Sequence, residues 1–463
     1  MNYDLIIIGS GPGGYVAAIR ASQLGLKTAI VEKSKLGGIC LNWGCIPTKS
    51  LLKSAQIYQS ILHAEEYGID VSGTINPDIS KMVERSRNIA ETMSKGVQFL
   101  LKKNKVDVIL GVGKLKSKDT IVVTDNTNNE TILTAKNIIL ATGAHSRELP
   151  NIPQDGVKVI GYKNALILNK KPDSMVIIGS GAIGSEFAYF YSSIGTKVTL
   201  VEYLPNIVPN EDEDVSRQLR RSFKKAKINV MENTSVENIN TSGEKCKVTI
   251  KTKKGVEEIE TDIILSAVGI TPNIDNLGVE ELGIEIENGK IKVDDFYKTN
   301  IDNIYAIGDI INTPALAHVA SAEGIACVEK IVGHNIEPID YGNIPGCTYT
   351  MPEISSFGLT EKKAKEQNID IKVGKFPFTA SGKAHASGTR DGFVKLIFNK
   401  KTDKLIGAHL IGANVTEMIS ELILSKKLKA SNIDIIKTIH PHPTMSEAIM
   451  EAAADANDEV IHI

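Results

Sequence analysis

Short apolar runs, each followed at once by glycine or other small residues, recur along the chain. The first run, Leu5–Ile8, lies almost at the N-terminus and leads directly into the loop Gly9–Gly14. Apolar runs of this length that end in a turn signal are typical of buried strands. A helix-like stretch follows up to Gly25, and a second apolar run ends at Glu32. The pattern therefore predicts strand, glycine loop, helix and strand over residues 5–32.

The same pattern returns 170 positions later, over residues 175–202. The shift superposes, without a gap, three loop glycines, the glycine after the helix-like stretch and the glutamate that ends the second run. The superposed pairs are Gly9/Gly179, Gly11/Gly181, Gly14/Gly184, Gly25/Gly195 and Glu32/Glu202. This register indicates one structural unit that is used twice.

Each copy is typical of a βαβ unit that binds a dinucleotide. The first loop glycine permits a tight turn, the second lets the backbone approach a pyrophosphate, and the third allows close packing of helix on strand. The phosphates then meet the free N–H groups and the positive dipole end of the helix. A purely structural turn is the alternative for a single glycine loop, but two copies in register argue against it.

The glutamate that closes each copy bears on the choice of cofactor. A carboxylate there can accept hydrogen bonds from ribose hydroxyls and repels a 2′-phosphate. No arginine follows Glu202 in residues 203–206. The second copy is therefore predicted to prefer NAD over NADP.

Three further strand-like runs end in small or acidic residues. Ile138–Gly143 and Ile263–Gly269 are counterparts in the two units, and Asn303–Asp309 is a shorter run. Asp309 at the end of its strand is suited either to hydrogen-bond a polyol or to form a turn, and both interpretations stay open.

The pattern changes from about residue 341 onward. Runs such as Gly392–Phe398 and Leu405–Leu410 precede helical stretches, and no glycine loop of the nucleotide-binding kind follows them. This predicts a separate α+β domain. The fold class expected for the whole chain is α/β, with two Rossmann-like dinucleotide-binding domains and a C-terminal α+β domain.

Length and charge narrow the possible functions. A chain of 463 residues predicts about three compact units. Lys and Arg total 53 against 55 Asp and Glu, so no basic field attracts nucleic acid. No apolar run reaches the roughly 18 residues of a spanning helix. The N-terminus lacks a signal or transit segment, which favours a cytoplasmic protein, although a processed organellar protein looks the same.

Two of the five cysteines carry the predicted chemistry. Cys246, Cys327 and Cys347 are scattered and are interpreted as structural thiols. Cys40 and Cys45 lie five residues apart, and close spacing in an intracellular protein indicates redox or metal chemistry rather than stapling. A metal site is disfavoured because no second Cys/His pair has a finger-like spacing.

A disulfide between Cys40 and Cys45 constrains the backbone. Residues five apart on an ideal helix have Cα atoms about 8.6 Å apart, whereas a disulfide needs less than about 7 Å. The segment is therefore expected to be a deformed helix or an irregular turn, with Gly44 supplying the distortion and helix continuing from Pro47. A thiolate at Cys45 would then be favoured by the helix dipole. An unbridged pair is the alternative.

Two charged residues and a C-terminal cluster complete the candidates. Lys49 is suited to stabilise negative charge on a reduced flavin, and Glu186 is expected to pair with it; a surface charge is the alternative for each. In the segment 440–447, His442 is a candidate base and Glu447 can orient it. Metal binding by His440 and His442 is the rival interpretation. A cis bond before Pro443 and an N-cap at Thr444 are also expected.

The motifs together resemble the pyridine nucleotide–disulfide oxidoreductases, and within them the dihydrolipoamide dehydrogenases, the E3 components of 2-oxo-acid dehydrogenase complexes. They lie in the family's order and span nearly the whole chain. The segments that carry the resemblance are Gly11–Tyr15, Cys40–Lys49, Ala141–Gly143, Val201–Pro209, Gly308–Asp309, Leu316–His318 and His440–Glu447. One departure is Trp43, where the family more often has a small apolar residue.

The resemblance implies a role for each candidate residue. Cys40 exchanges with the lipoyl group, Cys45 faces the flavin, and His442, oriented by Glu447, is the base that serves the other subunit of a homodimer. The residues implied to bind FAD are Gly9, Gly11, Gly14, Glu32, Lys49, Thr142, Gly143, Asp309, Ala317 and His318. Those implied to bind NAD are Gly179, Gly181, Gly184, Glu202 and Gly269.

The resemblance also implies domains, partners and a reaction. An FAD domain would cover 1–144 and be completed by 271–340, an NAD domain would cover 145–270, and a dimerisation domain would cover 341–463. Dihydrolipoamide on an acyltransferase or on a glycine-cleavage carrier protein would reduce the Cys40–Cys45 disulfide, and electrons would pass through FAD to NAD⁺. A glutathione-reductase-like or mercuric-reductase-like enzyme is the alternative, and a non-catalytic docking subunit is a rival of another class. Which complex is served, and how Trp43 affects the reduction potential, stay open.

Overall fold

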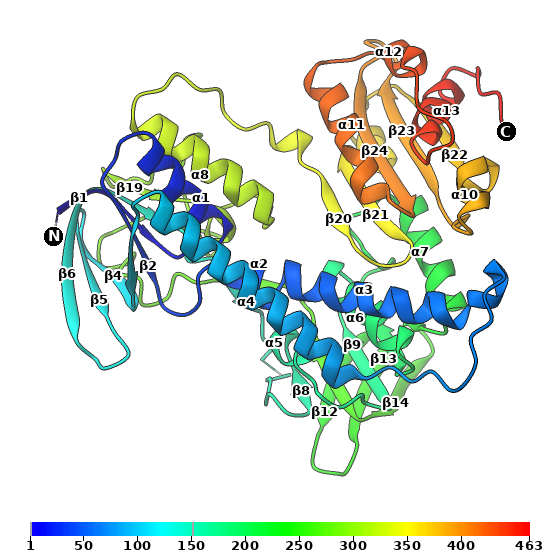
Figure 1. Ribbon diagram of the computed structural model, residues 1–463, viewed down its shortest axis with the longest axis horizontal. Coiled ribbons are helices and arrows are strands. Elements are labelled where there is room, and N and C mark those ends of the chain that lie inside the picture. The colour runs from blue at the N-terminus through cyan, green and yellow to red at the C-terminus, as the bar shows by residue number, and fades with distance from the viewer. Residues whose placement is uncertain (1, 151) are drawn as a thin grey trace. The chain divides into compact units, whose positions relative to one another are not determined.

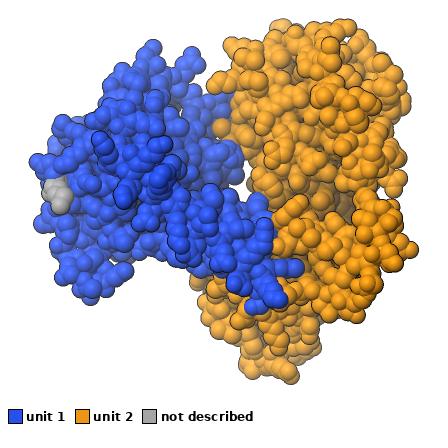
Figure 2. All heavy atoms as spheres, viewed as in Figure 1, with its two compact units in different colours: residues 1–51, 80–147, 270–341 blue, residues 52–79, 148–269, 342–463 orange. Residues whose placement is uncertain are grey.

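The computed structural model describes residues 2–150 and 152–463, which form two compact units (Figure 2). The first unit contains residues 1–51, 80–147 and 270–341, and the second contains residues 52–79, 148–269 and 342–463. Among the described residues, no helix has the length and apolar character needed to cross a membrane.

The first unit is built on a seven-stranded sheet in the order β3-β2-β1-β6-β5-β4, with β19 also paired to β6 (Figure 1). Its strands are β1 (Asn2–Ile8), β2 (Thr28–Glu32), β3 (Asp107–Leu110), β4 (Val112–Ser117), β5 (Thr120–Thr124), β6 (Glu130–Leu140) and β19 (Ile304–Ala306). The strands β3, β2, β1, β6 and β19 run parallel, and β4 and β5 form an antiparallel edge. The side chains of Leu5, Ile6 and Ile7 are all fully buried, as expected for a parallel strand covered on both faces.

Helices α1 (Pro12–Gln23) and α8 (Ala317–Ile331) lie side by side in this unit (Figure 1). Glycines bring the two helices close, since a Cβ on Gly324 would lie 2.7 Å from the carbonyl oxygen of Gly13. An ion pair between Arg20 and Glu329, 2.6 Å long, closes the far end of the contact. These contacts fix α1 and α8 against each other, and with them the positions of their two N-termini.

The remaining elements of the first unit are short apart from two long helices. They are α2 (Gly38–Trp43), the start of α3 (Cys45–Leu62), α4 (Ile79–Lys103), β7 (Ala144–Ser146), β16 (Ile270–Pro272), β17 (Ile286–Glu287), β18 (Lys290–Ile291) and the 3₁₀ turn η2 (Gly308–Ile310).

The second unit contains the second copy of the βαβ pattern. A five-stranded sheet has the order β11-β10-β9-β15-β8, and all four of its pairings are parallel. Its elements are β8 (Val159–Ile160), α5 (Tyr162–Ala165), β9 (Ser174–Ile178), α6 (Ala182–Ser193), β10 (Lys197–Val201), α7 (Glu213–Lys225), β11 (Asn229–Met231) and β15 (Ile263–Ser266). A three-stranded antiparallel sheet of β12 (Ser235–Asn240), β13 (Cys246–Thr252) and β14 (Gly255–Thr261) lies between β11 and β15 in sequence.

The C-terminal part of the second unit is an antiparallel sheet that packs against helices. Its strand order is β20-β21-β24-β23-β22, and α11 and α13 share one apolar core with it. The short turn η3 (Tyr341–Asn343) begins at the last residue of the first unit and leads into this part. The elements that follow are β20 (Gly346–Thr348), β21 (Glu353–Gly358), α9 (Glu361–Glu366), β22 (Ile371–Pro377), η4 (Phe378–Ala380), α10 (Gly382–Ala386), β23 (Phe393–Asn399), β24 (Leu405–Gly412), α11 (Val415–Lys427), α12 (Asn432–Lys437) and α13 (Glu447–Asp455). The turn η1 (Ala64–Tyr67) also belongs to the second unit.

A buried ion-pair network joins the two parts of the second unit. Lys395 on β23 is only 3% exposed, and its ammonium lies 2.8 Å from Asp212 at the start of α7 and 2.9 Å from Glu361. A lysine buried to this extent requires such partners. The first sheet, which is parallel apart from its β4–β5 edge, the parallel sheet of the second unit and the helix-covered antiparallel sheet confirm the predicted α/β class with a C-terminal α+β part.

Candidate active site

The first glycine loop leaves a helix terminus open for a ligand. Gly9 has a φ of +104°, and a Cβ on Gly14 would lie 1.9 Å from the carbonyl oxygen of Gly9, so both positions require glycine. Gly11 differs, because a Cβ there would meet no atom within 4 Å. No side chain caps α1 at Gly11, and its first turn has no acidic residue. Free N–H groups behind an open space fit the pyrophosphate of a dinucleotide.

The second glycine loop repeats this geometry. Gly179 has a φ of +94°, and a Cβ on Gly184 would lie 1.9 Å from the carbonyl oxygen of Gly179. A Cβ on Gly181 would meet nothing within 4 Å, and no side chain caps α6. Gly269, at the end of the neighbouring strand, also faces open space and has a φ of +113°. The second loop therefore fits a pyrophosphate as well as the first.

The glutamate that ends each copy is anchored by a loop serine. One oxygen of Glu32 accepts from the backbone N–H and the hydroxyl of Ser10, at 3.0 and 2.5 Å. Glu202 accepts in the same way from Ser180, at 2.9 and 2.5 Å. These serines were not among the residues predicted from the sequence, although both occupy the same position of the repeated loop. They fix each carboxylate beside its loop, where a ribose would follow a pyrophosphate.

The other predicted flavin-site residues of the first unit lie at strand and helix ends. The Thr142 hydroxyl donates to the carbonyl of Asn273 at 2.6 Å, and the Asn273 N–H donates to the carbonyl of Gly143 at 2.8 Å. Asp309 lies in the 3₁₀ turn after β19, and burial raises its carboxyl pKa. Ala317 and His318 are the first two residues of α8, whose N-terminus has no side-chain cap. Asn273, remote in sequence, was not identified from the sequence.

Cys40 and Cys45 lie on either side of a helix break. Helix α2 ends at Trp43, Gly44 has φ −142° and ψ −112°, and α3 begins at Cys45. The predicted distortion at Gly44 is thus confirmed, and the second helix begins two residues before Pro47. The segment thus departs from the regular helix in which residues five apart lie too far from each other for a disulfide.

The two sulfurs interact across the break. Both residues are thiols in the structure. The pKa of the Cys40 thiol is raised well above its usual range, first by a hydrogen bond to Cys45 and then by burial, while Lys49 acts in the opposite direction. The hydrogen bond to Cys45 and the burial of Cys40 therefore both oppose ionisation of the Cys40 thiol.

Lys49 and Glu186 belong to different units. Lys49 lies one turn after Cys45 on α3, in the first unit, and its charge acts on Cys40. Glu186 lies on α6 in the second unit, is 5% exposed, and accepts from the backbone N–H of Tyr349 at 3.0 Å. Their predicted pairing stays a prediction.

The C-terminal cluster forms two separate histidine–carboxylate pairs. His442 Nδ1 lies 2.9 Å from Glu447 Oε1, while the other carboxylate oxygen accepts from the Thr444 N–H at 2.8 Å. Burial opposes ionisation of Glu447, but these hydrogen bonds outweigh it and lower the carboxyl pKa. His440 instead pairs with Glu421, at 2.8 Å. The imidazole of His442 remains 79% exposed, so Nε2 is available to a proton donor.

The backbone around Pro443 and Thr444 bears on two predictions made from the sequence. The peptide bond before Pro443 is cis, as predicted. The N-cap predicted at Thr444 is wrong, because α13 begins at Glu447 and the Thr444 hydroxyl donates to the carbonyl of Pro441 at 2.7 Å. Among the described residues, no group of three or more His, Cys, Asp or Glu could hold a metal ion.

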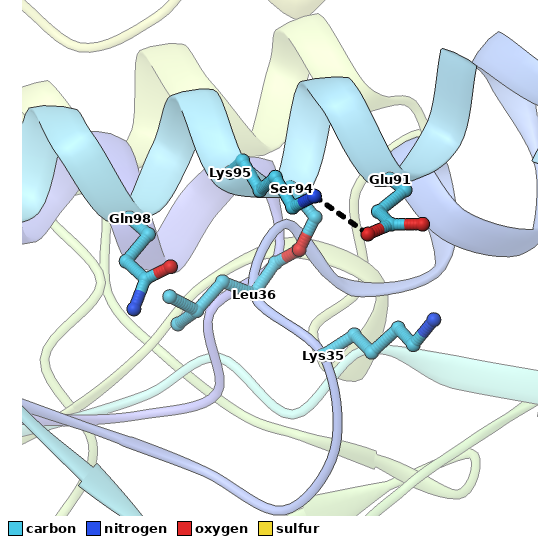
Figure 3. Close-up of a pocket in the computed structure, with 6 residues that line it drawn as sticks. All are labelled: Lys35, Leu36, Glu91, Ser94, Lys95 and Gln98. Carbon is cyan, nitrogen blue, oxygen red and sulfur yellow. Dashed lines mark hydrogen bonds and ion pairs between the residues drawn. The ribbon is translucent and has the colours of Figure 1, made fainter. Parts of the chain in front are cut away.

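Two surface hollows lie away from these residues. One, of about 250 Å³, lies between the loop after β2 and helix α4 and is lined by Lys35, Leu36, Glu91, Ser94, Lys95 and Gln98 (Figure 3). Another, of about 780 Å³, is lined by α7 and by residues 375–393, and contains Arg221 and Arg390. Neither contains a residue predicted for the site, so the geometry of the glycine loops and the cysteine pair is the better guide to function.

Family models match both parts of the chain. Residues 3–324 match the model described as pyridine nucleotide-disulphide oxidoreductase, and residues 344–453 match the dimerisation domain of the same family. The chain belongs to the pyridine nucleotide-disulphide oxidoreductases. The family predicted from the sequence is thereby confirmed.

Curated relatives of this oxidoreductase match it over almost the full length. It is 46% identical to a dihydrolipoyl dehydrogenase of Rhizobium etli and 45% identical to one of Zymomonas mobilis, each covering 100% of this chain and 99% of the relative. It is 42% identical to a dihydrolipoyl dehydrogenase of Bacillus subtilis, with 99% of both chains covered.

Solved structures have the same fold. LpdA of Mycobacterium tuberculosis superposes with a TM-score of 0.90 at 26% identity, covering 97% of this oxidoreductase and 98% of that chain. The HOCl-induced flavoprotein disulfide reductase RclA of Escherichia coli, as its Cu(II) complex, superposes with a TM-score of 0.88 at 26% identity, covering 98% and 99%.

Proposed function

We propose that this oxidoreductase is a dihydrolipoyl dehydrogenase, which oxidises a dihydrolipoyl group and reduces NAD⁺ to NADH. The observation that carries the proposal is the contact between Cys40 and Cys45 across the break at Gly44. A dithiol placed in this way can close to a disulfide and reopen, and the two glycine loops fit two dinucleotides. The full-length likeness to curated dihydrolipoyl dehydrogenases supports the same activity.

The cofactors of the proposal are FAD and NAD. Gly11 at the open end of α1, Glu32, Asp309 and the N-terminus of α8 are the groups that would hold FAD in the first unit. In the second unit Gly181, Gly184, Gly269 and Glu202 would hold NAD. Bound FAD would supply a two-electron acceptor between the cysteine pair and NAD⁺.

The substrate dithiol loses two electrons and two protons while the Cys40–Cys45 disulfide becomes two thiols. Cys40 exchanges with the substrate sulfur, and Cys45 takes over the electron pair of the broken S–S bond. NAD⁺ afterwards accepts two electrons and one proton, so the net reaction releases one proton and restores the disulfide. Lys49 stabilises the negative charge that develops beside it in the reduced protein.

His442 is proposed as the base that accepts a proton from the substrate dithiol. Its Nδ1 is held by Glu447 at 2.9 Å, which fixes the ring and stabilises the imidazolium that forms. The exposure of the ring and the match to a dimerisation domain support a site completed by a second copy of the chain. The active form is therefore proposed to be a homodimer.

The lipoyl carrier is proposed to be an acyltransferase core or a glycine-cleavage carrier protein, and the location to be the cytoplasm. A glutathione-reductase-like activity is the second candidate. Glu202, anchored by Ser180 and followed by no arginine in 203–206, disfavours the NADPH that such an activity uses.

The decisive assay follows NADH formation from dihydrolipoamide and NAD⁺, with NADPH and glutathione disulfide as the parallel reaction. Fast NADH formation supports the proposal, whereas activity only in the parallel reaction would replace the proposed substrate and cofactor. Cys45→Ser is expected to abolish turnover while the variant still assembles. Loss of assembly instead would favour a non-catalytic docking role.

A further inference from the structure

Helix α4 lies beside residues 36–50, the segment that contains α2, Gly44 and the start of α3 with the two cysteines (Figure 1). Ser94 donates to the carbonyl of Leu36 before α2, at 2.8 Å, in the region shown in Figure 3. At the other end, the buried Ser86 donates to the carbonyl of Pro47, at 3.0 Å, and Arg85 donates to the Ser50 hydroxyl at 2.7 Å. The helix thus contacts the segment before and after the break at Gly44.

Arg87 makes the contact nearest to the break itself. Its Nη1 donates to the carbonyl of Asn42 at 2.5 Å, and its guanidinium carbon lies 4.3 Å from the ring centroid of Trp43. Asn42 and Trp43 are the last two residues of α2, immediately before Gly44. A planar guanidinium can stack on an aromatic ring and donate in its own plane at the same time, which an ammonium cannot do.

The contact supplies a hydrogen-bond donor to a helix end that needs one. The last carbonyls of a helix lack intrahelical donors, and α2 stops at Gly44. The Asn42 carbonyl receives its donor from Arg87, which is 45 residues away in the chain. Trp43 provides the surface against which the guanidinium packs. Burial lowers the pKa of the Arg87 guanidinium, as expected for a cation packed against protein rather than surrounded by water.

We infer that Arg87, packed on Trp43, is a positioning residue for the redox pair: it fixes the end of α2 so that Cys40 stays in contact with Cys45. The inference rests on the proposed function, because it concerns the dithiol–disulfide equilibrium of that pair. Holding two thiols together reduces the conformational entropy lost when they join, and so favours the disulfide. A looser α2 would shift the pair toward the dithiol.

The direction of the effect separates positioning from charge. If Arg87 acted mainly through its positive charge, it would stabilise a thiolate and favour the reduced form, so its removal would favour the disulfide. If it acts by positioning, its removal favours the dithiol. The two explanations therefore predict opposite shifts of one equilibrium constant.

The experiment equilibrates the flavin-loaded protein with mixtures of reduced and oxidised dithiothreitol and counts the thiols of Cys40 and Cys45 by alkylation and peptide mass. In this exchange the protein disulfide takes up two electrons and two protons as dithiothreitol becomes its cyclic disulfide. Arg87→Gln and Trp43→Val are each expected to lower the equilibrium constant for the protein disulfide about five- to tenfold, where tenfold corresponds to about 30 mV.

Further variants test the same mechanism. Arg87→Lys keeps the charge but loses the planar contact, so the equilibrium constant for the disulfide should fall about as much as in Arg87→Gln. The Lys variant also tests the inference if the Gln variant does not fold. Trp43→Phe keeps a ring and should stay within about twofold of the unmodified chain. The double variant, which combines Arg87→Gln with Trp43→Val, should fall by less than the product of the two single effects, because both substitutions remove the same contact.

Lys95→Gln is the matched control, because Lys95 is an exposed cation of the same helix that pairs with Glu91, at 2.7 Å. It should leave the constant unchanged. An unchanged or increased constant in the Arg87 variants, or a product of independent effects in the double variant, would overturn the inference while the proposed function stands. A wild-type chain that forms no Cys40–Cys45 disulfide in any mixture would overturn both.

Discussion

A pair of alanine substitutions in the second glycine loop tests whether Gly184 is needed for the fold and Gly181 for binding of the proposed dinucleotide. A Cβ at position 184 would lie 1.9 Å from the carbonyl oxygen of Gly179, which is backbone and cannot move aside cheaply. At position 181 the same Cβ meets no protein atom within 4 Å, and φ −61° with ψ −176° is a conformation that alanine adopts freely. Gly184→Ala should therefore disturb the fold, and Gly181→Ala should disturb only binding.

Gly184→Ala should change mainly the free energy of unfolding, and Gly181→Ala mainly the affinity for NAD⁺. Gly184→Ala forces helix α6 away from β9, and overpacking of this type costs about 1–3 kcal/mol or more in the free energy of unfolding. Gly181→Ala should change that free energy by less than about 1 kcal/mol. If its methyl group displaces a phosphate from one charge-assisted hydrogen bond, the loss is about 1.5–3 kcal/mol. The dissociation constant for NAD⁺ should then rise about 10- to 150-fold.

The assay combines thermal unfolding with an NADH or NAD⁺ titration of each flavin-loaded variant. The first loop offers the internal comparison, since Gly14→Ala and Gly11→Ala should affect stability and FAD retention in the same way. Wild-type affinity for NAD⁺ in Gly181→Ala would refute the reasoning that the open space is the nucleotide site. Wild-type stability in Gly184→Ala would refute the steric argument.

Three further predictions follow from buried charges. Glu202→Ala removes the carboxylate that disfavours a 2′-phosphate, so the ratio of kcat/KM for NAD⁺ to that for NADP⁺ should fall at least about tenfold, measured in parallel steady-state assays. Lys395→Met leaves Asp212 buried without its cation, so the free energy of unfolding, measured by chemical denaturation, should fall by about 3–5 kcal/mol. A fall of less than about 1 kcal/mol would contradict the argument that the buried carboxylate needs this cation. Burial raises the pKa of Glu211 to about 7. Between pH 4.5, the ordinary pKa of the group, and pH 7, the folded chain therefore keeps a proton on Glu211 that the unfolded chain has released. The free energy of unfolding consequently falls as the pH rises through this range. Glu211→Gln should gain stability relative to the wild type, by up to about 3 kcal/mol, as the pH is raised from about 5 to about 8, and equal stability profiles would contradict the raised pKa.

Much of the fold was readable from local pattern. Apolar runs that end in glycine predicted β1 and β9, and apolar runs that end in glutamate predicted β2 and β10. Such strands and turns can be recognised because each restricts the residue types at neighbouring positions. The repeat at 170 positions carried the site geometry as well, since Gly14 and Gly184 meet the same steric limit in the structure. The break at Gly44 followed from the length of a disulfide compared with the rise of a helix.

The limits of local pattern were visible at the C-terminal cluster. The sequence pointed to Thr444 as a helix cap, but the Thr444 hydroxyl is used by the carbonyl of Pro441 and α13 begins at Glu447. Side chains such as threonine can satisfy several nearby backbone groups, and tertiary contacts decide which one is chosen.

By itself, then, the sequence determined the kinds of elements, the two repeated glycine loops and the residues proposed to carry the chemistry. Only the tertiary structure decided which distant groups support them. Asn273 holds Thr142 from 131 residues away, and Arg87 reaches the end of α2 from 45 residues away. Lys395 is buried only because Asp212 and Glu361 converge on it from other segments. Such partners are fixed by packing, which brings residues together irrespective of their separation along the chain, whereas periodicity and spacing report only on neighbours within a few turns.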